Sequence, residues 1–212
     1  VVNHDGRGLR DVGVNAGRIA AVGDLGAACA REVVDCSGLH VLPGVIDTQV
    51  HFREPGAMHK EDLAAGALGA VKGGVTAVFE MPNTKPLTIT EEAINDKLTR
   101  AAGRMWCDHA FYVGATHGNA KALAELELLP GVCGVKIFMG ASTGDLLVPD
   151  DDGVRDVLSH GRRRVAIHSE DEEILRANAG LAREGDWTSH PEVRSAGAAR
   201  KCTERRVKIA RE

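Results

Sequence analysis

Short apolar segments alternate with amphipathic stretches from about residue 45 to the end of the chain. Five apolar segments have the pattern of strands and centre near Val45, Thr76, Ala110, Val135 and Val165. Five stretches with helical spacing lie between or after them, at residues 61–72, 91–102, 120–128, 154–160 and 171–183. Strands that alternate with helices predict a parallel sheet with right-handed crossovers. We expect the first strand to include residues 41–46, buried and entered through a Pro-Gly bend.

The first 44 residues lack this alternation of strands and helices. Short alternating pieces at residues 9–14, 18–22 and 33–35 are separated by Gly and Asp, which is typical of a small β-sheet domain. The sequence therefore predicts a small, incomplete β-domain at residues 1–44, and a strand–helix domain at residues 45–212.

Composition narrows the class of protein. The 212 residues are 43% hydrophobic and 26% charged, which is ordinary globular composition. No apolar run approaches the roughly 20 residues that cross a bilayer, and no signal-peptide pattern is present, so we expect a cytoplasmic protein without a membrane partner. Five cysteines without a C-x-x-C pair favour reduced thiols over disulfides or cysteine-bound zinc.

Charge argues against a nucleic-acid partner. The net charge is −4, and only 3% of residues are aromatic, so there is little to stack on bases. We expect the basic runs at residues 162–164 and 205–206 to be solvated faces.

Four segments carry candidate chemistry. His51 falls in D-T-Q-V-H-F-R-E-P-G at residues 47–56, where a strand ends, and His168 ends a later strand. The carboxyl ends of parallel barrel strands line active sites. Lys136 lies inside an apolar strand, where an unpaired ammonium is costly, and Asn83 follows another strand in M-P-N-T. The structural alternatives are core histidines, a lysine that reaches solvent or pairs with a carboxylate, and an asparagine that only shapes its turn.

These motifs together resemble dihydroorotases, in the dihydroorotase, allantoinase and dihydropyrimidinase group of the amidohydrolase superfamily. The resemblance implies a (β/α)8 TIM-type barrel preceded by a small β-domain. It implies that His51, Lys136 and His168 hold one or two divalent ions, expected to be zinc, with carbon dioxide bound as a carbamate on Lys136. Arg53 and Asn83 would bind the substrate, and a general-base aspartate and a further histidine ligand would lie beyond residue 212. The other histidines match no ligand position: His4, His40, His59, His109, His117, His160 and His190.

Gln49 departs from the family pattern, which has a histidine at that position. A neutral carboxamide is a weak ligand for metals that prefer imidazole, so one metal position should be weakened. Arg53 suits a substrate carboxylate, because a guanidinium can donate two parallel hydrogen bonds to it. The resemblance therefore favours reversible hydrolysis of dihydroorotate to N-carbamoyl-L-aspartate in pyrimidine biosynthesis. The alternatives are an allantoinase or dihydropyrimidinase, and a non-catalytic homologue that is a scaffold for aspartate transcarbamoylase; a homo-oligomer is a further expected partnership.

The number of strand–helix units is too small for a closed barrel. An eight-unit barrel takes about 250 residues, or roughly 30 per unit, and five strands are counted here. We therefore expect the chain to be an amino-terminal fragment that is poorly stable and inactive alone, because a partial barrel exposes an edge and apolar surface.

Overall fold

The computed structural model describes residues 1–140 and 146–212. These form two compact units, Val1–Val45 and Ile46–Glu212, and each is described by itself.

The first unit contains two small antiparallel sheets. Strand β1 (Val2–Asn3) pairs with β2 (Gly6–Arg7), and β3 (Asp11–Asn15) pairs with β4 (Arg18–Gly23). Ala16 and Gly17 both have positive φ in the β3–β4 turn, as a tight hairpin with a right-handed twist requires. The strand predicted at residues 33–35 is wrong: this segment pairs with no strand, and Val33 and Val34 are exposed.

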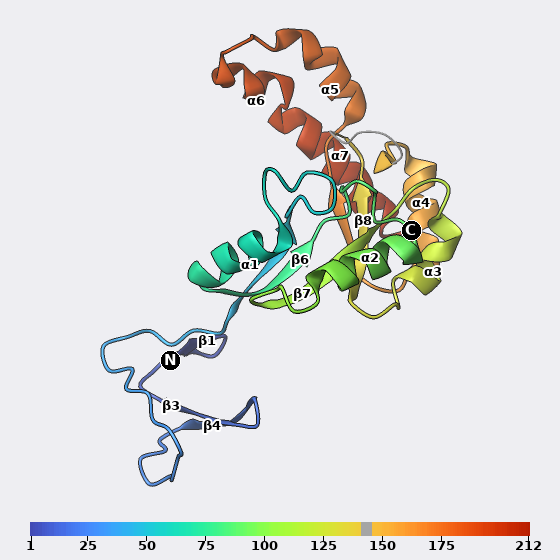
Figure 1. Ribbon diagram of the computed structural model, residues 1–212. Coiled ribbons are helices and arrows are strands. Elements are labelled where there is room, and N and C mark those ends of the chain that lie inside the picture. The colour runs from blue at the N-terminus through green and yellow to red at the C-terminus, as the bar shows by residue number, and fades with distance from the viewer. Residues whose placement is uncertain (141–145) are drawn as a thin grey trace. The chain divides into compact units, whose positions relative to one another are not determined.

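The second unit is built on one parallel sheet that curls into half of a barrel (Figure 1). Its strands follow the chain in order: β5 (Val45–Val50), β6 (Val75–Glu80), β7 (Asp108–Gly114), β8 (Val132–Phe138) and β9 (Val165–His168). The pairs β6–β7, β7–β8 and β8–β9 are parallel. The fold class predicted from the sequence is confirmed, and a strand lies at each of the five predicted centres. The first strand begins only at Val45, so the prediction that it includes residues 41–44 is wrong.

Helices follow the strands, as the hydrophobic pattern predicts. They are α1 (Leu63–Lys72), α2 (Glu91–Ala101), α3 (Leu123–Leu126), α4 (Asp151–His160), α5 (Glu172–Asn178), α6 (His190–Val193) and α7 (Ala196–Ile209). Asp62, Thr90 and Asp150 cap three of them, since each side chain accepts a hydrogen bond from the backbone N–H three residues later. The helix predicted at residues 120–128 is shorter, a 3-10 turn (Ala120–Ala122) followed by α3.

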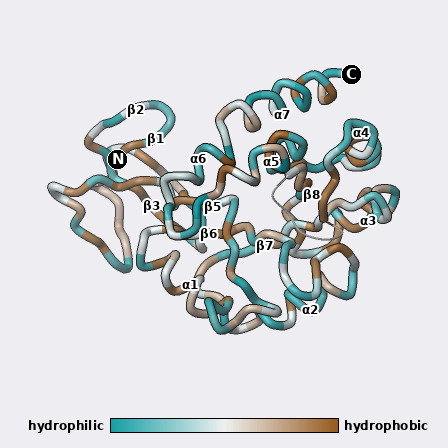
Figure 2. The backbone as a smooth tube through the Cα atoms, turned by 90° about the horizontal axis from the view of Figure 1, so that it is seen from above, coloured by the Kyte–Doolittle hydropathy of each residue, from teal (hydrophilic) through white to brown (hydrophobic). Residues whose placement is uncertain are grey.

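The hydrophobic core lies between the sheet and its helices. Val78 and Phe111 pack against Leu63 of α1, and a second cluster joins Ile137 to Val154 of α4. In Figure 2, β8 is drawn in hydrophobic colours, whereas α4 and α7 carry long hydrophilic stretches. Because side chains alternate along a strand, the opposite face of the same sheet is left for Tyr112 and Lys136.

Two predictions about burial are wrong. Val45 and Ile46 are each 55% exposed, because β5 is an edge strand and only its last residue, Val50, packs against the core. Arg206 is buried and donates to Asp151 at 2.7 Å, because α7 packs on the first turn of α4. The run at residues 205–206 is therefore not a solvated face.

Within the described ranges, none of the helices is both long and apolar enough to span a membrane.

Candidate metal and substrate site

The structure places the predicted site residues along one edge of the sheet. His51 directly follows β5, Asn83 lies three residues after β6, Lys136 is in the second half of β8, and His168 is the last residue of β9. This is the carboxyl edge of a parallel sheet, where barrel enzymes bind their substrates. Arg53 lies two residues beyond His51 on the same loop.

His51 and Asn83 are in direct contact. The Nδ1 atom of His51 lies 2.8 Å from Oδ1 of Asn83, and a carboxamide oxygen can only accept, so Nδ1 carries the proton and Nε2 keeps its lone pair. Burial lowers the pKa of His51, and the cations of Arg53 and Lys136 lower it further. The neutral imidazole that metals bind is thereby favoured at neutral pH. Asn83 thus orients the ring of a candidate ligand.

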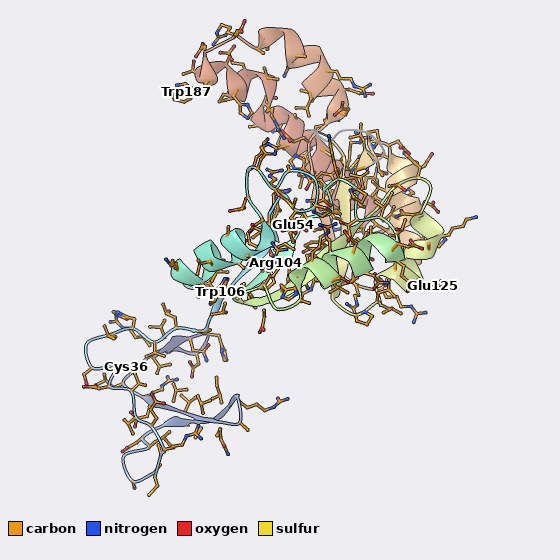
Figure 3. All side chains as sticks on the ribbon, viewed as in Figure 1. Cys36, Glu54, Arg104, Trp106, Glu125 and Trp187 are labelled. Carbon is orange, nitrogen blue, oxygen red and sulfur yellow. The ribbon has the colours of Figure 1, made fainter. Side chains whose placement is uncertain are left out.

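Arg53 adopts a left-handed backbone conformation, with φ of 48°. Its side chain is exposed and makes no hydrogen bond or ion pair within the part of the chain that the structure describes. The neighbouring Glu54 is buried instead, and accepts hydrogen bonds from Leu63 N at 3.0 Å and from both terminal nitrogens of Arg104 at 2.7 and 3.0 Å (Figure 3). Glu54 therefore anchors the loop, and Arg53 is left available for an anion.

Lys136 is the most unusual side chain of the site. It is 1% exposed, so it does not reach solvent, and no carboxylate among the described residues pairs with it. Its ammonium lies 5.0 Å from the centre of the Phe138 ring. Burial lowers the pKa of Lys136 to about 8, which increases the fraction of neutral amine. A neutral amine is the form that reacts with carbon dioxide.

His168 and Lys136 both lie against the ring of Phe138. The rings of His168 and Phe138 are stacked with centres 6.2 Å apart, and the two residues are register partners in β9 and β8. The Nε2 atom of His168 contacts Oε2 of Glu170 and lies 3.1 Å from Nη2 of Arg194. Arg194 also holds Glu170 directly, and this contact lowers the pKa of Glu170 to about 2.

Glu170 and Arg194 are absent from the site predicted from the sequence. Glu170 had a usable signal, a carboxylate two positions after a candidate ligand. Arg194 had none, since it lies 24 residues further on, after α6.

The donor set by itself is incomplete for a metal. Across residues 1–140 and 146–212, no three His, Cys, Asp or Glu side chains gather as a metal site would need. His51 and His168 would supply two imidazoles, and a third, anionic donor would be required. A carbamate on Lys136 would supply it, and the burial of Lys136 without a carboxylate partner fits that modification. Gln49 is exposed on β5, and its backbone N–H donates to Asp47 at 2.9 Å.

Comparison with known proteins relates the chain to enzymes that act on cyclic amides. The family described as "Dihydro-orotase-like" matches residues 38–116. An allantoinase from Deinococcus radiodurans is 35% identical over 189 residues, 86% of this chain and 42% of the relative. An allantoinase from Escherichia coli is 38% identical over 199 residues, 87% of this chain and 43% of the relative.

The fold is also similar to solved structures of hydantoinases. The L-hydantoinase (dihydropyrimidinase) from Arthrobacter aurescens superposes with a TM-score of 0.87 at 25% identity, over 99% of this chain and 48% of the neighbour. A D-hydantoinase matches with a TM-score of 0.79 at 20% identity, which supports the fold alone.

The fold and the comparisons together support the amidohydrolase superfamily. These relatives are named allantoinase and L-hydantoinase (dihydropyrimidinase), and the chain spans only 42–48% of their length.

Proposed function

We propose that the whole protein to which this chain contributes is a metal-dependent hydrolase of cyclic amides. The observation that carries the proposal is Lys136, buried without a carboxylate partner among the described residues, on the sheet edge that also holds His51 and His168. The likeness to allantoinases and to an L-hydantoinase supports the same reaction class.

Each residue has a role in this proposal. His51, carbamylated Lys136 and His168 hold the metal, and Asn83 keeps Nδ1 of His51 protonated so that Nε2 can bind. When bound there, a divalent ion would supply a water nucleophile with a pKa of about 7 and would polarise the ring carbonyl. Arg53 extends from the same loop and binds an anionic or carbonyl oxygen of the substrate. Because Gln49 replaces an imidazole, we propose that one metal position is weaker than the other.

The first candidate substrates are allantoin and hydantoin-type rings, because the curated and structural relatives are named for them. Dihydroorotate is the second candidate. Exposed Arg53, unpaired within the described chain, favours it, since a guanidinium matches the carboxylate that dihydroorotate carries.

A substrate panel tests the reaction and chooses between the candidates. The whole protein should hydrolyse at least one of allantoin, hydantoin, dihydrouracil and dihydroorotate, lose turnover with a chelator and regain it with added divalent metal. If dihydroorotate is the substrate, Arg53→Met should raise its KM by about 10- to 100-fold, because a charge-assisted hydrogen bond contributes about 1.5–3 kcal/mol. Arg200→Met, an exposed arginine on α7, is the control and should leave KM unchanged.

Two outcomes would contradict the proposal. Turnover that persists without metal would remove the metal from the mechanism. Metal-loaded protein that hydrolyses none of the four rings, yet raises the activity of a co-purified aspartate transcarbamoylase, would favour the scaffold instead.

A further inference from the structure

Three side chains meet at the end of β9. His168, Glu170 and Arg194 are each partly buried, with 30%, 13% and 32% of the side chain exposed. Arg194 donates from Nε to Oε1 of Glu170 at 3.0 Å and from Nη2 to Oε2, so the guanidinium and the carboxylate face each other as a two-bond pair. The same Oε2 also contacts Nε2 of His168.

The chemistry of these groups fixes the position of one proton. A carboxylate only accepts and a guanidinium only donates, so Nε2 of His168 can satisfy one of its two neighbours. Arg194 is already paired with Glu170, and a bare Nε2 lone pair would lie against an ionised carboxylate oxygen. The stable arrangement therefore has Nε2–H donating to Glu170. Nδ1 is then the nitrogen of His168 that can bind a cation.

We propose that Glu170, held by Arg194, is a positioning residue that fixes the tautomer and ring orientation of His168 for metal binding. This inference rests on the metal centre proposed above. Carboxylates that accept from the second nitrogen of a ligand histidine orient the ring and raise its basicity. The Phe138 ring restrains the other side of His168 by stacking.

The proposal also gives a role to the junction between α6 and α7. Arg194 is the residue after α6, and Ser195 caps α7 by accepting from Ala198 N at 3.3 Å. The junction is therefore fixed both to α7 and to the end of β9. A substitution at Arg194 should therefore weaken metal binding indirectly, by loosening Glu170 and hence His168, although Arg194 itself is not a ligand.

The test compares Glu170→Gln and Arg194→Met with two control variants, Glu204→Gln and Arg200→Met. The control pair is an exposed ion pair on α7, with 72% and 81% of the side chains exposed. In the whole protein, Glu170→Gln should weaken divalent metal binding by about 10- to 100-fold, as loss of such a partner does. Arg194→Met should weaken it less, because the carboxylate remains. The controls should bind as the parent does, and the unfolding midpoints of the metal-free proteins verify that all variants fold.

A second readout needs no metal. Nitrogen-15 spectra of the metal-free parent should show His168 as the Nε2–H tautomer, and Glu170→Gln should convert it to a mixture of tautomers. A parent spectrum with the proton on Nδ1 would overturn the proposal, and so would metal affinity in Glu170→Gln within roughly twofold of the parent, below the effect of such a partner. A parent that shows the Nε2–H tautomer but binds no divalent metal would instead contradict the metal centre of the proposed function.

Discussion

Glu80, the last residue of β6, and Lys97 of α2 are two ionisable side chains in the interior of the protein. Both side chains are almost fully buried and form an ion pair, and Lys97 also donates to the Met81 carbonyl at 3.0 Å. The second carboxylate oxygen of Glu80 has no partner within the described chain. Burial raises the pKa of Glu80 from 4.5 to about 7, despite the opposing charges of Lys97 and Arg53. Burial therefore makes the Glu80 carboxyl, two residues before Pro82, harder to ionise than a carboxyl group in water.

This shift predicts a pH dependence of stability. Because the pKa of Glu80 is higher in the folded than in the unfolded state, its stabilising contribution is complete below pH 4.5 and is lost as the pH rises through about 7. Between these values the free energy of unfolding of the parent should fall relative to Glu80→Gln, by at most about 1.4 kcal/mol per pH unit. Denaturation of both proteins from pH 4.5 to 8 measures it.

The control is Glu125→Gln, on the exposed side of α3 (Figure 3). Its stability curve should run parallel to that of the parent at every pH. If the Glu80→Gln curve also runs parallel to the parent, Glu80 carries no shifted proton.

Helix α1 packs directly against the loop that carries His51 and Arg53. Phe52, between His51 and Arg53, is 6% exposed and lies over Gly66 of α1. A Cβ atom added at Gly66 would lie 2.7 Å from Cε1 and 2.9 Å from Cγ of Phe52, which is too close without movement of the ring. Helix and loop thus fit only because residue 66 has no side chain.

A pair of glycine substitutions tests that fit. Gly66→Ala should destabilise the protein by about 1–3 kcal/mol, as overpacking does. Gly69→Ala lies in the same helix, where an added Cβ meets nothing within 4 Å, and should stabilise by roughly 0.5–1 kcal/mol through helix propensity. Chemical denaturation measures both. Equal effects at the two positions would contradict the close contact with Phe52.

Helices and strands with a clear pattern of apolar residues could be predicted from the sequence, whereas segments with a short or irregular apolar pattern could not. The five barrel strands and helices α1, α2 and α4 have long apolar patterns and capping residues. The strand predicted at residues 33–35 is wrong because a strand needs a neighbouring strand to pair with, and a short apolar run does not show that such a neighbour exists. The burial of β5 was overestimated because edge position is a property of the sheet and not of the strand.

At the scale of the whole molecule, the sequence allowed prediction of those candidate site residues that lie at the carboxyl ends of strands. His51, Lys136 and His168 were predicted because each lies in an apolar strand or just after one, within motifs that resemble those of dihydroorotases. Glu170 and Arg194 could not be assigned a role, because their contact joins residues 24 positions apart and depends on where α6 ends. The roles of the site residues stay predictions, and so do the domain limits at residues 1–44 and 45–212.

Metal content of the whole protein and of its Lys136→Ala variant tests the central claim most directly. Elemental analysis of the parent should find divalent metal, with at least one ion per chain, because carbamylated Lys136 supplies the anionic donor. Lys136→Ala should lose most of that metal, whereas Lys72→Ala, at the exposed end of α1, should keep it. Metal that remains at the parental level in folded Lys136→Ala protein would contradict the account.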